Sequence, residues 1–123
     1  MAKNLSVAVL LDFYGEMLTD KQRDVIDLYY NQDLSLSEIA EHQGITRQGV
    51  RDSIKRGEVF LFELEDKLKM FESYIDTQKT IQGIKYVIER VEKENKVYHY
   101  SNAISDNIDQ INTIIDNYVK KTS

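Results

Sequence analysis

The stretch SLSEIAEHQGITRQGVRDSIKRG, residues 35–57, decides the fold because its residue types fit two helices joined by a tight corner. Ser35 is a good N-cap for the first helix, and Glu38 stands three residues later, where it completes a capping box. Gly44 suits the left-handed backbone that a corner between two helices requires. The spacing therefore predicts a helix-turn-helix.

The second helix of this motif is expected to present two different faces. Thr46 can cap it, and Val50 with Ile54 forms its inward, apolar face. On the outward face, glutamine and arginine can reach base edges, and lysine or arginine can contact backbone phosphates. Asp52 shares that face and opposes the binding of phosphate. The candidate residues for binding nucleic acid or another partner are Thr46, Arg47, Gln48, Arg51, Lys55 and Arg56.

The composition indicates an all-α protein. The 123 residues include no proline, only five glycines and 30% charged residues, which favours long helices over a turn-rich β fold. The net charge of -5 and the sequence pI near 5.0 run against the basic surface usual in nucleic-acid-binding proteins. Within residues 46–57, however, four basic residues stand against one acidic residue, so positive charge is concentrated on the second helix of the motif.

Two further helices are expected before the motif. Apolar residues at spacings of three and four predict a first helix over about residues 5–18. Thr19 and Gln22 form a second capping pair, for a helix that ends near Asn31. Residues 1–57 are therefore interpreted as one helix-turn-helix domain, in which the first two helices brace the last two.

Residues 58–123 form a C-terminal helical extension in this interpretation. Three heptad-like apolar seams run through it, and Phe60 and Phe62 lie off the first seam. Because three short helices cannot easily cover this much apolar surface among themselves, we expect long C-terminal helices that form a bundle and make a homodimer. The seams consist of Leu61, Leu64, Leu68, Phe71 and Ile75; of Ile81, Ile84, Ile88 and Val91; and of Ile104, Ile108, Ile111, Ile115 and Tyr118.

The sequence contains no recognisable catalytic or metal-binding pattern. Neither His42 nor His99 has a carboxylate or nucleophile at a motif spacing, and the absence of cysteine excludes disulfides and thiolate metal sites. The N-terminal apolar run from Val7 to Leu11 is too short for a signal peptide or a membrane span. We therefore expect a cytoplasmic, non-enzymatic protein with no cofactor and no membrane insertion.

The longer stretch LTDKQRDVIDLYYNQDLSLSEIAEHQGITRQGVRDSIKRG, residues 18–57, resembles the promoter-reading region 4 of bacterial sigma factors. Over about the first 72 residues, the chain is more similar still to the YlxM family, small helix-turn-helix proteins of Gram-positive bacteria and mycoplasmas. The motifs that carry this resemblance are DFYG (12–15), LTDKQR (18–23), YY (29–30), SLSEIA (35–40), TRQGV (46–50) and IKR (54–56).

The resemblance to the YlxM family implies a function that the spacing of residues does not. Members of that family are typically encoded beside components of the signal recognition particle, so the resemblance implies a regulatory role in protein targeting. The partner would then be the GTPase or the RNA of the particle. The alternative is a sequence-specific DNA-binding transcriptional regulator, which the capped helix-turn-helix and the basic outward face favour.

Overall fold

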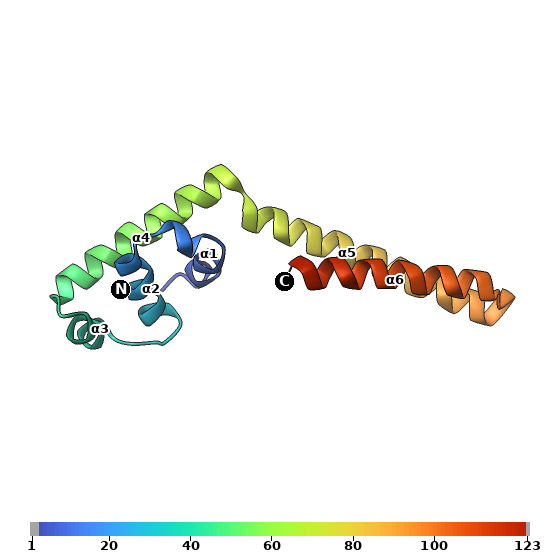
Figure 1. Ribbon diagram of the computed structural model, residues 1–123, viewed down its shortest axis with the longest axis horizontal. Coiled ribbons are helices and arrows are strands. Elements are labelled where there is room, and N and C mark those ends of the chain that lie inside the picture. Colours follow the sequence, from blue (N-terminus) through green and yellow to red (C-terminus); the bar gives the residue numbers. More distant parts are fainter. Residues whose placement is uncertain (1–2, 123) are drawn as a thin grey trace. The chain divides into compact units, whose positions relative to one another are not determined.

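The computed structural model describes residues 3–122, apart from the side chain of His99, and this part of the chain forms helices without any β-strand (Figure 1). The all-α fold class predicted from the composition is therefore confirmed. The chain divides into two compact units, Met1–Ser73 and Tyr74–Ser123. The elements are α1 (Ser6–Tyr14), η1 (Gly15–Met17), α2 (Asp20–Tyr30), α3 (Leu36–Gln43), α4 (Arg47–Leu68), α5 (Met70–Glu94), η2 (Asn95–His99) and α6 (Asn102–Thr122).

The caps of α2, α3 and α4 confirm where the sequence predicts that these three helices begin. Thr19 and Gln22 form a complete capping box at the start of α2, and Ser35 and Glu38 form another at the start of α3. The hydroxyl of Thr46 accepts a hydrogen bond of 2.9 Å from the backbone N–H of Gly49 and so caps α4. These side chains satisfy backbone donors that a helix N-terminus leaves unpaired.

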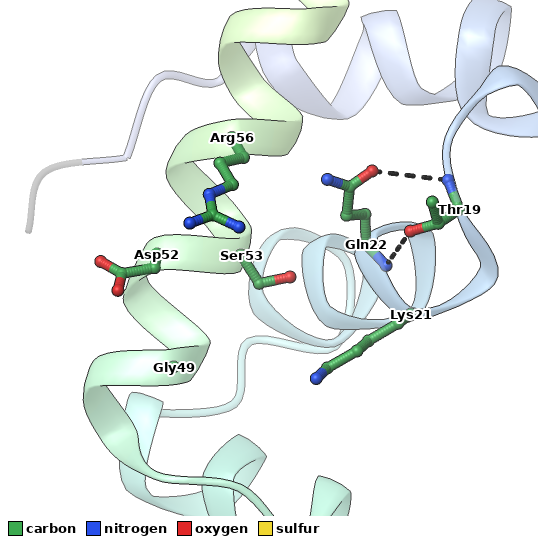
Figure 2. A pocket seen from close by; sticks show the side chains of 7 residues that line it. All are labelled: Thr19, Lys21, Gln22, Gly49, Asp52, Ser53 and Arg56. Atoms are coloured by element: carbon green, nitrogen blue, oxygen red, sulfur yellow. Dashed lines mark hydrogen bonds between the residues drawn. The ribbon is translucent and has the colours of Figure 1, made fainter.

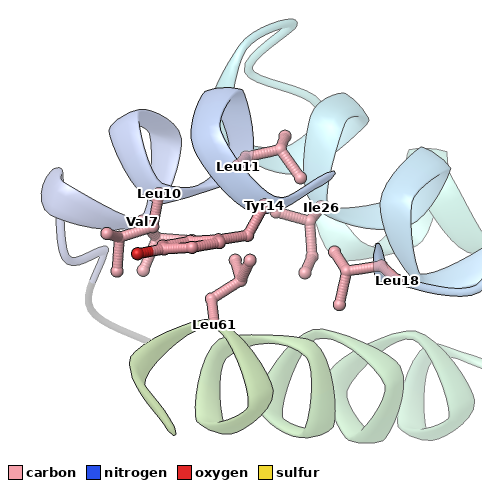
Figure 3. Packing of buried hydrophobic residues seen from close by; sticks show 7 residues of the cluster. All are labelled: Val7, Leu10, Leu11, Tyr14, Leu18, Ile26 and Leu61. Atoms are coloured by element: carbon pink, nitrogen blue, oxygen red, sulfur yellow. The ribbon is translucent and has the colours of Figure 1, made fainter. Parts of the chain in front are cut away.

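The core of the first unit consists of two apolar clusters that meet along α4. In the first cluster, α1 packs across α4 (Figure 3), and the buried residues are Val7, Leu10, Leu11, Tyr14, Leu18, Ile26 and Leu61. In the second cluster, α2 and α3 pack against the first half of α4, and the buried residues are Val25, Leu28, Tyr29, Ile39, Ala40, Val50 and Ile54. Helix α4 is thus the element against which the other three helices of this unit are assembled.

One helix end differs from the expectation. The first helix does not continue to residue 18, because α1 ends at Tyr14 and the 3-10 turn η1 follows. That turn lets Leu18 adopt an extended backbone and enter the core beside α2. Helix α4 continues past Gly57, and the two compact units divide between Ser73 and Tyr74, whereas the sequence placed the division after Gly57. Leu61, assigned by its sequence pattern to the extension, lies in the core of the first unit.

The corner between α4 and α5 is held by side chains of the first unit. Lys69 ends α4 in the left-handed conformation, with a φ of 55°. The Glu65 carboxylate accepts hydrogen bonds from the Tyr14 hydroxyl, at 2.6 Å, and from the backbone N–H of Phe71, at 3.0 Å. The Tyr14 hydroxyl in turn accepts from the backbone N–H of Met70, at 3.1 Å. The first turn of α5 therefore obtains its N-terminal cap from α4 and α1.

The second unit is a helical hairpin in which α6 runs antiparallel to the later part of α5 (Figure 1). Asn95 is buried at the bend, where its side chain bonds the backbone N–H and C=O of Ser101. Lys85 and Asp116 form an ion pair of 3.5 Å between the two helices. Among the described residues of this unit, Ile108 is the one fully buried apolar side chain, whereas many on the predicted seams remain exposed, among them Ile84, Val91, Ile104, Ile111 and Tyr118. Within residues 3–122, no helix is long and apolar enough to cross a membrane.

Candidate nucleic-acid interface

The helix-turn-helix predicted from the sequence is present as α3, a corner and α4. Gly44 stands at the corner with a φ of 67°, so the left-handed conformation expected for it is confirmed. No side-chain or backbone atom lies within 4 Å of where its Cβ would be, so the backbone conformation, and not crowding, requires the glycine. Val50 and Ile54 are fully buried against α3, and they fix which face of α4 is turned outward.

Five of the six candidate binding residues lie on the first three turns of α4, the sixth immediately precedes it, and they do not share one function. Thr46 serves as the cap of α4. Arg47, Gln48 and Arg51 border a hollow of about 320 Å³ beside Leu36 of α3. Lys55 and Arg56 stand further along α4 and are exposed. The helix therefore presents two groups of polar side chains, one next to α3 and the other beyond it.

One of the candidate residues is engaged within the helix. The side-chain amide of Gln48 donates a hydrogen bond of 3.0 Å to the carboxylate of Asp52. This bond holds Gln48 in one orientation and partly satisfies the carboxylate that opposes phosphate on this face. The second amide hydrogen and the carbonyl oxygen of Gln48 remain available to bond a base edge.

The basic side chains of the first unit divide into paired and unpaired groups. Lys3 pairs with Asp33 at 2.6 Å, Arg23 with Asp20 at 3.0 Å, and Lys69 with Asp66 at 3.6 Å. Among the described residues of the same unit, the cations without an ion pair are Lys21, Arg47, Arg51, Lys55, Arg56 and Lys67. Four of these six are candidate binding residues on α4. An anion could bind them without breaking any internal ion pair.

Lys21 is a residue that the sequence reasoning did not select. It lies in the first turn of α2 and, with Ser53 and Arg56 of α4, borders a groove of about 350 Å³ between the two helices (Figure 2). In the sequence, Lys21 is one of several polar residues on a bracing helix. Only the packing of α2 against α4 places it on the same groove as Arg56, so no local pattern could have identified it.

A hydrogen bond from a tyrosine at the end of α2 holds α4 against α2. The hydroxyl of Tyr30 donates a hydrogen bond of 2.6 Å to the carboxylate of Glu58. Burial, together with this bond to a carboxylate, raises the pKa of Tyr30 to about 12, so the tyrosine stays protonated at neutral pH. The bond helps to hold α4 in place against α2.

The described residues contain no cluster of histidine, aspartate and glutamate that could hold a metal ion. The site is instead a helix face with basic side chains, which suits polyanions that bind through their charge and hydrogen-bond acceptors.

Comparison with known proteins identifies relatives of the whole motif. The family described as "Putative helix-turn-helix protein, YlxM / p13 like" (UPF0122) matches residues 1–101. A UPF0122 protein of Clostridium kluyveri is 42% identical over 119 residues, which cover 97% of this chain and all of the relative. A UPF0122 protein of Acetivibrio thermocellus is 51% identical over 75 residues, 61% of this chain and 64% of the relative. One of Bacillus thuringiensis is 42% identical over 96 residues, 78% of this chain and 87% of the relative.

Proposed function

Because the chain belongs to the UPF0122 family of YlxM-like helix-turn-helix proteins, we propose that it is a non-enzymatic regulatory protein that binds nucleic acid through the outward face of α4. The observation that carries the proposal is the set of unpaired cations on that face, in a chain whose net charge is -5. An acidic protein that gathers unpaired arginine and lysine on one helix has an electrostatic reason to bind a polyanion there.

We further propose that the target belongs to the signal recognition particle and that the protein acts in the cytoplasm. The support is the resemblance of the first 72 residues to the YlxM family, with its implied link to protein targeting. Of the two components of that particle, its RNA suits the basic face of α4 better than its GTPase does, because phosphates can neutralise all of these cations. The resemblance to sigma region 4 supports the same face as the binding surface.

We propose that the protein is a homodimer formed through its C-terminal helices. The support is the exposed apolar side chains of the second unit, which a two-helix hairpin cannot cover by itself. A dimer would carry two copies of the basic face and would double the number of phosphate contacts. Sedimentation equilibrium should give a dimer at micromolar concentration, and a strict monomer would contradict this proposal.

Affinity capture from a lysate, with and without nuclease, tests the target. Wild-type protein is expected to retain the RNA of the signal recognition particle, and the double variant Arg51→Glu with Lys55→Glu is expected to lose it. The matched control is Lys79→Glu with Lys93→Glu, which makes the same charge change on exposed residues of α5. If both double variants retain the RNA equally, the outward face of α4 is not the binding surface.

The alternative is a DNA-binding transcriptional regulator, and the geometry of α4 favours it. Arg47, Gln48 and Arg51 lie at the start of the second helix, where helix-turn-helix proteins contact base edges in the major groove. Recovery of specific promoter DNA, without the RNA or GTPase of the particle, would establish this alternative in place of the targeting role.

A further inference from the structure

We propose that the groove between α2 and α4 is a phosphate site, in which Lys21 and Arg56 hold one phosphodiester group of a nucleic-acid backbone. The inference rests on the proposed nucleic-acid binding and adds to it a residue outside the helix-turn-helix. Lys21 belongs to α2, the helix that precedes the motif. The proposal therefore extends the binding surface from one helix to two.

The directions of the side chains support this assignment. Figure 2 shows Lys21 reaching from α2 towards α4 and Ser53 pointing from α4 towards α2, while Arg56 lies along α4 and lines the same groove. Asp52 also borders the groove, but its carboxylate points away from Lys21 and Ser53. The same carboxylate accepts the hydrogen bond from Gln48. Lys21, Ser53 and Arg56 thus line the groove with hydrogen-bond donors, and the carboxylate of its one acidic residue, Asp52, points away.

The donors match the chemistry of a phosphodiester. Its two non-bridging oxygens accept hydrogen bonds and share one negative charge, whereas ammonium, guanidinium and hydroxyl groups all donate. Neither Lys21 nor Arg56 has an ion pair among the described residues. A phosphate would consequently compete with water alone for these two cations.

The walls of the groove are held at a fixed spacing. On the α2 side, Thr19 and Gln22 are both committed to the capping box. Below the groove, α2 and α4 cross so closely that a Cβ at Gly57 would lie 2.3 Å from the Cδ1 of Ile26 and 4.0 Å from the Cβ of Gln22. Because the two helices share a packed crossing, the backbones that carry Lys21 and Arg56 are held at a fixed spacing before any ligand binds, which reduces the ordering cost of binding.

The position of the groove also agrees with the way a helix is inserted into a nucleic-acid groove. Arg47 and Arg51 lie on the α3 side of α4, and the α2 groove lies on its other side. In helix-turn-helix proteins the recognition helix reads bases while the first helix of the motif, here α3, crosses the backbone, and Lys21 would add a backbone contact from α2. A phosphate held by Lys21 and Arg56 would set the orientation of α4 relative to the strand without contributing to the choice of sequence.

Binding should be measured as a function of salt, with full-length protein and two labelled probes, a duplex DNA and a hairpin RNA of equal length. On B-DNA, removing one phosphate-binding cation lowers the magnitude of the slope of log K against log salt by about 0.9. Lys21→Ala is expected to show a decrease of this size on whichever probe binds, and Lys21→Arg is expected to keep the wild-type slope. Lys67→Ala is the matched control, because Lys67 is an exposed, unpaired lysine on α4 away from the groove.

The outcomes separate this inference from the function on which it rests. A wild-type slope for Lys21→Ala, with a reduced slope for Arg51→Ala, would overturn the groove and leave nucleic-acid binding by α4 intact. Wild-type protein that binds neither probe in a salt-dependent way would overturn both. An equal reduction for Lys21→Ala and Lys67→Ala would reduce the effect to the overall charge of the protein and would overturn the groove.

Discussion

The two units of this chain are built from similar apolar spacings, yet they bury their side chains to very different degrees. In the first unit, four helices pack together and enclose two clusters of buried side chains. In the described part of the second unit, the α5–α6 hairpin buries Ile108 and Asn95 and leaves the seam residues Ile104 and Ile111 exposed. Two antiparallel helices can cover one narrow stripe each, whereas crossing helices can cover a helix on several sides. Apolar spacing therefore predicts a helix but does not reveal whether the chain itself covers its apolar face.

A pair of isoleucine variants compares the two units directly. Ile54→Ala removes a side chain that is 0% exposed, and it should lower the free energy of unfolding of the first unit by about 2–5 kcal/mol. Ile111→Ala removes one that is 42% exposed in the chain by itself, and it should cost within about 0.5 kcal/mol at low protein concentration.

Urea denaturation at a low and a high protein concentration measures both variants. If the second unit is covered by a second copy of the chain, the cost of Ile111→Ala should rise with concentration, while that of Ile54→Ala should not. A large, concentration-independent cost for Ile111→Ala would show that the hairpin is as self-sufficient as the first unit.

The α4–α5 corner offers a test of how the first unit closes. Tyr14→Phe removes the hydroxyl that donates to Glu65 and accepts from the backbone N–H of Met70. Because the bond to Glu65 involves a carboxylate, its loss should cost about 1.5–3 kcal/mol of unfolding free energy. Tyr98→Phe, which removes the hydroxyl of a tyrosine that is 75% exposed, is the matched control. An unchanged denaturation midpoint for Tyr14→Phe would mean that the corner contributes nothing to the stability of the fold.

The same corner predicts a dependence of stability on pH. Burial acts to raise the pKa of Glu65, but the bonds from Tyr14 and from the amides of Phe71 and Glu72 outweigh it, so its native pKa lies below the ordinary 4.5. Its contribution is present above about pH 4.5 and is lost as the pH falls through the native value. Burial and the bond to Glu65 raise the native pKa of Tyr14 above the ordinary 10.0. The contribution of Tyr14 to stability is therefore present below about pH 10.0 and is lost as the pH rises through the raised native pKa. Glu65→Gln should flatten the acid side of the stability profile.

The features that could be predicted from the sequence are those that depend on a few neighbouring residues. The caps formed by Thr19, Ser35 and Thr46, and the left-handed Gly44, were all predictable because each satisfies a local requirement of the backbone. The inward face of α4 followed from the helical period. The sequence also predicts that the candidate binding residues lie together, because they stand at the start of one helix. Their role in binding remains a prediction.

The features that could not be predicted depend on residues distant in the sequence. Lys21 and Arg56 come together only through the crossing of α2 and α4. Tyr14 and Glu65 meet only because α1 lies across α4. Gly57 is compatible both with a helix end and with a close helix crossing, and periodicity does not distinguish the two. A local pattern thus locates a helix, while the site and its supports come from packing between helices.

The bend of the second unit depends on one buried polar side chain. The Asn95 side-chain amide donates to the backbone C=O of Ser101 at 3.0 Å and to the hydroxyl of Ser105 at 3.2 Å, and its carbonyl accepts from the N–H of Ser101 at 2.8 Å. Asn95→Ala leaves these groups without partners and should cost about 1–3 kcal/mol, measured by denaturation. Asn95→Asp keeps the acceptor for the Ser101 N–H but turns a carboxylate oxygen towards the Ser101 C=O, so it should cost at least as much. If neither variant changes the stability, the hairpin does not depend on the Asn95 side chain.

Two glycine-to-alanine variants sharpen the contrast between the units, because we expect only the variant in α5 to stabilise the protein. At Gly57, an added Cβ would lie 2.3 Å from the Cδ1 of Ile26, a fully buried side chain with little room to move. Overpacking of this kind costs about 1–3 kcal/mol, and the better helix propensity of alanine returns about 1 kcal/mol, so Gly57→Ala should be neutral to destabilising. At Gly83, in the interior of α5, no atom lies within 4 Å of the added Cβ, so Gly83→Ala should stabilise the helix by about 0.5–1 kcal/mol.

Thermal denaturation of both variants measures the two changes in stability. A stabilising Gly57→Ala would mean that α2 and α4 can separate without cost, and the fixed spacing that aligns Lys21 with Arg56 would then be lost. A destabilising Gly83→Ala would instead indicate that another surface packs against α5 at this position, because the hairpin itself places no atom there.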